Sequence, residues 1–195
     1  MAPARDRCCR CGAPDDWFAS SRFGLEPDIL TCAKGVTSGY LPAGAVIAAP
    51  SVAEPFWSPD AGLWRHGYTY SGHATVAAAA IANLDIMQRE DLCGRARTLE
   101  SSLLAALAPL AGHELVEEVR GGVGVLAAVN LRQDLVASDA SLPSKVGSAC
   151  RDAGMLIRPL VGGALAVSPP LVIEDSDITT IAESFRAGLD AVAMG

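Results

Sequence analysis

The residue with the clearest capacity for covalent chemistry is Lys34, which stands between an apolar run, residues 29–33, and Gly35. This pattern predicts a buried strand with one amine at its end. A lysine becomes nucleophilic when desolvation or a nearby cation lowers its pKa, because the neutral amine attacks a carbonyl carbon and forms a Schiff base. Gly35 and Gly39 allow the backbone to approach a flat ligand closely. Without further context, a Lys-Gly pair after a strand is more often a surface turn.

A second candidate is Thr69, which lies in the segment HGYTYSGH, residues 66–73. A small hydroxyl between aromatic residues, just before an expected helix, suits phosphate binding. Hydroxyl and backbone N–H donors can converge on an anion at such a position. The alternative is that Thr69 or Ser71 only caps the helix that follows.

The third candidate is Arg158, in the segment Ile157-Arg158-Pro159 at the end of an expected strand. A planar guanidinium grips a carboxylate with two parallel hydrogen bonds, which a lysine cannot do. Arg158 is therefore a candidate to bind a carboxylate substrate. The alternative is an ion pair with a structural acid such as Glu174 or Asp177.

The composition excludes several classes of protein. Hydrophobic residues make up 50% of the 195 residues, charged residues only 19%, and the net charge is −7, so a nucleic-acid partner is not expected. No apolar run reaches the roughly 18 residues of a membrane span, and residues 1–7 lack the apolar stretch of a signal peptide behind them. We therefore expect a cytoplasmic protein.

The cysteines do not predict a metal site. Cys8, Cys9 and Cys11 are clustered, but no second cysteine or histidine pair stands at a spacing that completes a tetrahedral site. We expect reduced thiols and no metal.

The pattern of apolar residues predicts a mixed α/β chain. Strands are expected over residues 29–33, 44–49, 115–120, 125–131 and 155–158, and helices over 74–90, 144–153, 176–194 and a segment that ends at 109–112. Residues 51–65 hold two prolines and two tryptophans and predict a loop bordering the active site. The expected core positions recur at helical spacing: Val76, Ala80, Leu84 and Met87; Leu99, Leu103, Leu107 and Leu110; Ile178, Ile181, Phe185, Leu189 and Val192.

Three motifs together resemble one enzyme family. They are WFASSRFGLEPDILTCAKGVTSGY with the LPAGAVIAAP that follows (17–50), HGYTYSGHATVAAAAIAN (66–83), and Ile157-Arg158-Pro159 followed by Ser-Pro-Pro-Leu at 168–171. In this order they resemble the class III, pyridoxal-phosphate-dependent aminotransferases, or omega-transaminases. The resemblance runs from Trp17 to Gly195, and residues 1–16 do not share it.

The resemblance implies a fold and a set of roles. The fold is the end of the large domain of a fold type I pyridoxal-phosphate-dependent transferase, residues 17–90, followed by its α+β C-terminal small domain, residues 91–195. Lys34 is expected to carry pyridoxal phosphate. Thr69 is expected to contact the phosphate of the cofactor bound mainly by the other subunit, which implies a homodimer. Arg158 is expected to recognise the substrate carboxylate.

The expected reaction is amino transfer between an amine or amino acid and a keto acid such as pyruvate. In the family, an aspartate keeps the pyridine nitrogen protonated, and it lies in an Asp-Glu-Val strand that this sequence lacks. Asp15 and Asp16 are the only nearby candidates, and they lie in the segment 1–16, which does not share the resemblance. We therefore expect greatly impaired activity from the chain alone. Two alternatives remain: another reaction of the family, as in a decarboxylase or aminomutase, and a non-catalytic fragment that folds on a partner. The amine donor is not predicted.

Overall fold

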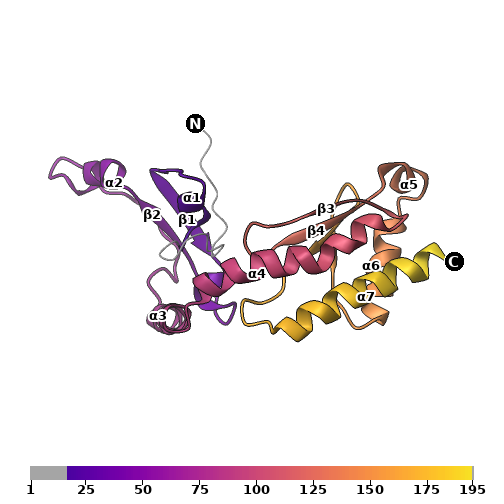
Figure 1. The fold of residues 1–195 in the computed structure, drawn as a ribbon. Coiled ribbons are helices and arrows are strands. Elements are labelled where there is room, and N and C mark those ends of the chain that lie inside the picture. Colours follow the sequence, from indigo (N-terminus) through magenta and orange to yellow (C-terminus); the bar gives the residue numbers. More distant parts are fainter. Residues whose placement is uncertain (1–16, 195) are drawn as a thin grey trace. The chain divides into compact units, whose positions relative to one another are not determined.

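The computed structural model describes residues 17–194 and divides the chain into two compact units, Met1–Gly94 and Arg95–Gly195. Figure 1 shows helices and strands in both units. The α/β class expected from the sequence is confirmed. The domain ranges 17–90 and 91–195 stay predictions, and the expectation for residues 1–16 lies outside the described residues.

The first unit contains short elements around a two-stranded antiparallel sheet. In order, they are α1 (Ala19–Arg22), β1 (Ile29–Ala33), the 3-10 helix η1 (Gly35–Thr37), β2 (Gly44–Ala48), α2 (Pro50–Trp57) and α3 (Ala74–Arg89). β1 and β2 pair in register from Ile29 opposite Ala48 to Ala33 opposite Gly44. α3 packs against η1, so the helix supports the turn that follows β1.

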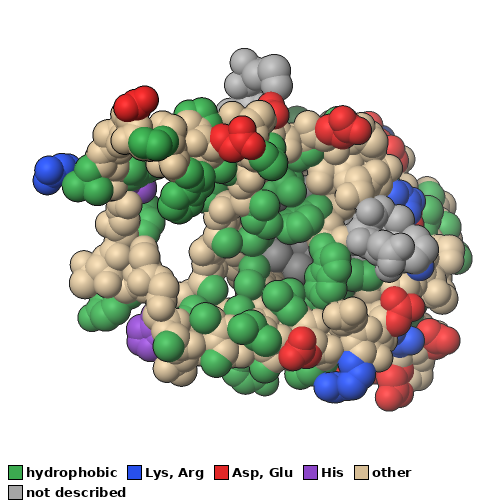
Figure 2. Space-filling model, turned by 90° about the vertical axis from the view of Figure 1, so that its left-hand side faces the viewer, with side chains coloured by type: hydrophobic (Ala, Val, Ile, Leu, Met, Phe, Trp, Pro, Cys, Tyr) green, Lys and Arg blue, Asp and Glu red, His purple; other side chains and the backbone are tan. Residues whose placement is uncertain are grey.

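The strands β1 and β2 form where the sequence predicts them, but neither is buried. β1 alternates between exposed and half-buried positions, and every residue of β2 is exposed. The prediction of a buried strand before Lys34 is therefore wrong for this chain. The physical reason is that the sheet has two strands among residues 17–194, and no described layer covers the faces of β2. Hydrophobic side chains are accordingly visible at the surface in Figure 2.

The prediction of a loop over residues 51–65 is wrong in its first half, where α2 forms. Pro50 occupies the first turn, where its fixed φ suits a helix and its missing N–H would have no partner. The amides of Val52 and Ala53 both bond to the Ala49 carbonyl. Pro55 lies inside the helix, but in so short a helix it removes few backbone hydrogen bonds.

The second unit is an antiparallel four-stranded sheet with helices. The elements, the first of which begins just before the unit boundary, are α4 (Leu92–Leu107), η2 (Ala108–Gly112), β3 (Val116–Arg120), β4 (Ala127–Leu131), α5 (Gln133–Ser138), α6 (Leu142–Asp152), β5 (Arg158–Pro159), β6 (Ala164–Val167) and α7 (Asp175–Ala193). The strand order is β3-β4-β6-β5. α6 packs against α7 and against β5 and β6.

The predicted strand over residues 155–158 is wrong in its bounds. Only Arg158 and Pro159 form β5, opposite Ala166 and Leu165 of β6. A hairpin turn at Gly162 and Gly163, both with positive φ, joins β5 to β6 and sets which residues of the two strands face each other. Pairing therefore starts at Arg158. β6 itself was not predicted.

The leucine and phenylalanine positions predicted for the core of this unit are confirmed. Leu99, Leu103, Leu107 and Leu110 are at most 2% exposed, and Phe185 and Leu189 of α7 are fully buried. In α3, by contrast, Met87 is buried, whereas Val76, Ala80 and Leu84 are only half-buried. The first unit therefore contributes much less core than the pattern predicts.

Candidate functional site

Lys34 stands between β1 and η1 in an unusual backbone conformation. Its φ of 63° and ψ of −79° fall outside the regions that residues with a Cβ normally adopt. Such a conformation costs on the order of 1–3 kcal/mol, so the surrounding contacts must hold it in place. The Lys34 carbonyl accepts hydrogen bonds from the amides of Thr37, at 3.3 Å, and Gly39, at 3.2 Å. The turn is thus closed by the backbone on the C-terminal side of the lysine.

Two side chains complete this turn. The Thr37 side chain is buried, at 1% exposure, and its Oγ1 donates to the Leu41 carbonyl at 2.5 Å. Asn83 of α3 donates from Nδ2 to the carbonyls of Gly35, at 2.9 Å, and Val36, at 3.1 Å. Neither residue was predicted from the sequence. An available signal was the presence of an asparagine within an alanine-rich helix, where this residue is not favoured.

The Lys34 side chain is uncovered in the described part of the chain. Lys34 is exposed, and its side chain makes no hydrogen bond or ion pair with any residue between 17 and 194. The described part of this chain therefore does not remove the Lys34 amine from water. The local backbone fixes the position of the lysine, while the described residues leave its side chain uncovered.

Thr69 lies in a tight turn before α3. The Ser71 amide donates to the Tyr68 carbonyl at 3.0 Å, and the Tyr68 amide donates to the Ser71 hydroxyl at 3.1 Å. Thr69 is exposed at the tip of this turn. The N-cap of α3 is His73, without a side-chain capping bond, so the alternative that Thr69 or Ser71 caps the helix is wrong. The Thr69 hydroxyl has no partner among residues 17–194.

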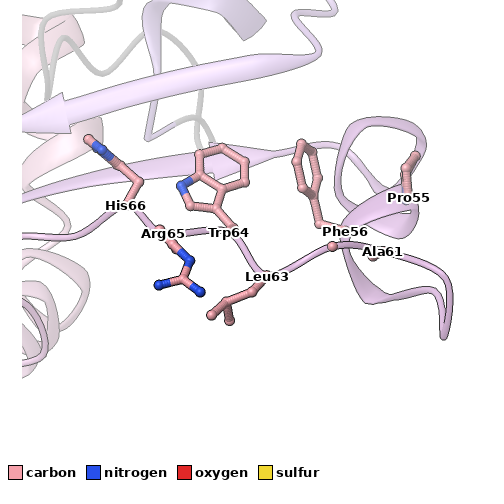
Figure 3. Close-up of a pocket in the computed structure, with 8 residues that line it drawn as sticks. Pro55, Phe56, Ala61, Leu63, Trp64, Arg65 and His66 are labelled. Carbon is pink, nitrogen blue, oxygen red and sulfur yellow. The ribbon is translucent and has the colours of Figure 1, made fainter.

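A row of aromatic rings leads toward the Thr69 turn. Ring centroids are 4.5 Å apart for Phe56 and Trp64, 6.2 Å for Trp64 and His66, and 5.8 Å for His66 and Tyr68. Figure 3 shows the Phe56 and Trp64 rings side by side, with Leu63 and Arg65 directed away from them. These rings border a cavity of about 450 Å³. Its lining residues are Pro55, Phe56, Ala61, Gly62, Leu63, Trp64, Arg65 and His66.

Arg158 lies in the second unit, on the edge strand β5, and is exposed. Its guanidinium makes no ion pair with any acid in the described part of the chain. The two acids considered as structural partners have another role. Glu174 and Asp177 form a capping box at the start of α7, in which the Glu174 amide donates to the Asp177 carboxylate at 3.3 Å. Arg158 is thus free to bind an anion.

The described residues form neither a metal site nor a membrane span. Between residues 17 and 194, no three histidine, cysteine or acidic side chains are grouped as a metal site requires. Cys8, Cys9 and Cys11 lie outside the described residues. None of the described helices is both long enough and apolar enough to cross a membrane.

Comparison with known sequences identifies relatives over nearly the whole chain. A family model described as "Aminotransferase class-III" matches residues 9–189. The putrescine–pyruvate aminotransferase of Pseudomonas aeruginosa is 35% identical over 190 residues, which are 95% of this chain and 41% of that protein. The omega-aminotransferase of Caulobacter vibrioides is 37% identical over 185 residues, with 94% and 41% covered. The chain thus spans about 41% of the length of these curated relatives.

Solved structures give the same result. A transaminase from work on directed evolution by ancestral reconstruction matches with a TM-score of 0.86 and 38% identity, over 95% of this chain and 42% of that one. An (S)-enantioselective omega-transaminase from Thermomicrobium roseum matches with a TM-score of 0.85 and 33% identity, over 95% and 42%. An amine transaminase from an uncultivated Pseudomonas species, described as PLP-bound, matches with a TM-score of 0.83 and 35% identity, over 94% and 42%.

Proposed function

Because this chain belongs to the class III aminotransferases, a pyridoxal-phosphate-dependent family, we propose that it serves amino transfer between an amine or amino acid and a keto acid such as pyruvate. The observation that carries the proposal is the placement of Lys34. Its amine is unpartnered among the described residues and stands at the end of β1, on a turn fixed by Thr37 and Asn83. A lysine without a competing ion pair is available to react with an aldehyde.

Lys34 has two tasks in this proposal. Its amine would hold pyridoxal phosphate through the cofactor's aldehyde, and the same amine would move the proton at the substrate carbon as general acid and base. When bound, the cofactor supplies an electron sink for the carbanion. The exposed position of Lys34 gives the amine room to leave and return.

Thr69 and Arg158 bind the anionic ends of cofactor and substrate. The Thr69 hydroxyl is exposed at the tip of its turn and can donate to a phosphate, which in the family belongs mainly to the partner subunit's cofactor. We therefore include a homodimer in the proposal, on the strength of the family resemblance, and with it the cytoplasmic location expected from the sequence. Arg158 is exposed and unpaired with any described acid, which suits two parallel hydrogen bonds to a carboxylate.

The described residues fit two groups of the cofactor, the aldehyde and the phosphate, and not the whole of it. Lys34 fits the aldehyde and Thr69 fits a phosphate, but no described acid can be assigned to the pyridine nitrogen. Asp15 and Asp16, the candidates from the sequence, lie outside the described residues. A missing electrostatic partner of this kind costs several kcal/mol of transition-state stabilisation. The chain alone is therefore expected to turn over amine and keto acid pairs barely above background.

The exposed apolar surface of the first unit favours a second candidate, a non-catalytic fragment that folds on a partner. Val46 is 69% exposed, Trp57 84% and Trp64 58%. Side chains of this kind are normally covered in a protein that works alone. Robust turnover by the isolated, monodisperse chain would exclude this candidate and contradict the expected impairment.

Borohydride reduction tests the role of Lys34. The chain contains two lysines, Lys34 and Lys145, and Lys145 forms an ion pair with Asp139 at 2.8 Å. After incubation with pyridoxal phosphate and reduction, peptide mapping is expected to find the pyridoxyl label on Lys34. Lys145 is the internal control, and a label mainly on Lys145 would contradict the assignment.

Kinetics in a completed enzyme test the role of Arg158. In a chimera that adds the preceding portion of the Pseudomonas aeruginosa relative, Arg158→Ala is expected to raise KM for keto acids by a factor equivalent to about 1.5–3 kcal/mol, the worth of a charge-assisted hydrogen bond. Uncharged amines are expected to be nearly unaffected. Arg151→Ala, another exposed arginine of the same unit, is the control. Equal losses for both substrate types would remove the carboxylate role.

A further inference from the structure

Asn83 links the middle of α3 to the turn that holds Lys34. Its Nδ2 donates to the carbonyls of Gly35, at 2.9 Å, and Val36, at 3.1 Å, across 48 and 47 residues of sequence. Both partners are carbonyl oxygens, which only accept, so the amide must present its nitrogen to them. The Gly35 and Val36 carbonyls belong to the first two residues after the lysine.

The position of Asn83 is not explained by helix formation. Asparagine is a weaker helix former than alanine, because its short polar side chain competes for backbone hydrogen bonds. The neighbouring positions of α3 are mostly alanine. The side chain makes its bonds to η1 and a weak one, at 3.6 Å, to the sulfur of Met87. Its bonds to Gly35 and Val36 are thus its main structural role.

The backbone at Lys34 requires such a support. With φ of 63° and ψ of −79°, the residue lies away from every favoured region, and it relaxes to another conformation unless its neighbours are held. The backbone angles of a residue determine where its Cβ points and which rotamers its side chain adopts. A change in ψ at Lys34 therefore redirects the amine.

We propose that Asn83 is a positioning residue that fixes the direction in which Lys34 presents its amine to the cofactor's aldehyde. The inference rests on the proposed function of Lys34, but its structural part concerns the turn itself. In the step concerned, the neutral amine adds to the aldehyde carbon and the carbonyl oxygen leaves as water. A carbon–nitrogen double bond forms, with no oxidation or reduction.

The experiment compares three variants of the full chain. Asn83→Ala removes the donors, Asn83→Asp keeps the shape without the N–H groups, and Gln88→Ala removes an exposed amide of the same helix as the control. Because alanine favours helix more than asparagine does, Asn83→Ala does not weaken α3 by propensity. An effect on the Lys34 turn is then due to the lost hydrogen bonds.

Two readouts are made on each variant. Hydrogen exchange is measured on peptides covering residues 34–41, whose amides include the bonds from Gly39 to Lys34 and from Tyr40 to Thr37. The ratio of pyridoxyl label on Lys34 to that on Lys145 is measured after borohydride reduction. Both Asn83 variants are expected to exchange about tenfold faster and to lower the labelling ratio about tenfold, the effect of one or two hydrogen bonds. Gln88→Ala is expected to match the wild type.

The outcomes separate this inference from the proposed function. If the wild type prefers Lys34 and the Asn83 variants keep that preference, the inference is overturned and the proposed function stands. If the wild type shows no labelling preference for Lys34, the proposed function fails, and hydrogen exchange alone then tests the inference about Asn83. Faster exchange in both Asn83 variants then supports Asn83 as the residue that holds the turn, and unchanged exchange overturns it.

Discussion

The two units of this chain differ in how they treat their apolar residues. In the second unit, the hydrophobic side chains of α4, β4, β6 and α7 form a core in which Leu107, Val129 and Phe185 are fully buried. In the first unit, the buried hydrophobic residues among those described are Met87, Leu92 and Cys93, at its C-terminal end. Large side chains such as Tyr40, Trp57 and Tyr70 are more than 80% exposed instead.

This difference shows which parts of the fold depend on local pattern and which depend on covering layers. A two-stranded sheet forms in the first unit because β1 and β2 are close in sequence and rich in residues that favour strands. Burial of a sheet face needs another layer packed on it. The second unit contains its own layers, whereas β2 has none among the described residues.

The largest effect is expected from Phe185→Ala in the second unit. Phe185 is fully buried, so the truncation removes apolar contacts and leaves a cavity, at a cost of about 3–5 kcal/mol in the free energy of unfolding. The matched control is Phe23→Ala in the first unit, where the side chain is 58% exposed. That change is expected within about 0.5 kcal/mol of the wild type. Urea unfolding measures both, and equal effects would contradict the difference between the units.

The second largest effect is expected from Gly188→Ala, at the place where α7 packs against α6. A methyl group there would lie 2.5 Å from the Cys150 sulfur and 2.8 Å from the Cys150 backbone nitrogen, and the nitrogen cannot move without the whole helix. We expect a loss of roughly 3 kcal/mol, the upper part of the usual range for overpacking. This outweighs the gain of about 1 kcal/mol that alanine brings to a helix.

The control for Gly188→Ala is Ala187→Gly, at an exposed position of the same helix. It is expected to cost about 1 kcal/mol through helix propensity alone. The two substitutions are chemically opposite, and thermal unfolding is expected to show that both destabilise the fold. A stabilised Gly188→Ala variant would mean that α6 and α7 are not packed as closely as described.

The third prediction compares the stability effect of the same substitution, valine to threonine, in two strands. Val129→Thr in β4 places a hydroxyl in a fully buried position, with an expected cost of about 1–3 kcal/mol. Val46→Thr in β2 changes a side chain that is 69% exposed, so we expect stability within about 0.5 kcal/mol and less aggregation. Urea unfolding and light scattering measure the two quantities. A large loss from Val46→Thr would show that β2 is covered in solution.

The same distinction explains what the sequence could predict. The leucine spacing of α4 and the acidic start of α7 are local signals. α7 forms within one residue of the expected range, and α4 ends at Leu107, two residues before the expected end at 109–112. The apolar residues of β1 predicted a strand correctly but burial incorrectly, because burial depends on a layer that the strand itself does not encode. β6 was missed because its short alanine-rich segment is assigned by pairing with β4 and β5.

The candidate site was predictable only as far as its motifs extend. Lys34, Thr69 and Arg158 stand in recognisable segments, and their roles stay predictions. The contact from Asn83 to the Lys34 turn joins residues 48 and 47 positions apart, so the asparagine in an alanine-rich helix is a local signal, but its partner is not predictable from the local sequence. The strained φ at Lys34 is likewise a result of the fold, because the lysine side chain itself disfavours it.

The smallest effect is expected from the pH dependence of the exposed start of α6. The Lys145 amine bonds to the Asp139 carboxylate, and with the Ser141 hydroxyl and amide it lowers the pKa of Asp139 from 3.8 to about 2. A carboxylate with a lowered pKa stabilises the fold above the unfolded pKa of 3.8, and this contribution is lost as the pH falls from there through 2. The Asp139 side chain is 40% exposed and that of Lys145 58% exposed, so added salt reduces the effect. In urea unfolding at low salt, wild type is expected to exceed Asp139→Asn in stability at pH 6, and the difference should shrink toward pH 2. A difference that stays constant with pH would assign the effect of the substitution to lost hydrogen bonds rather than to charge.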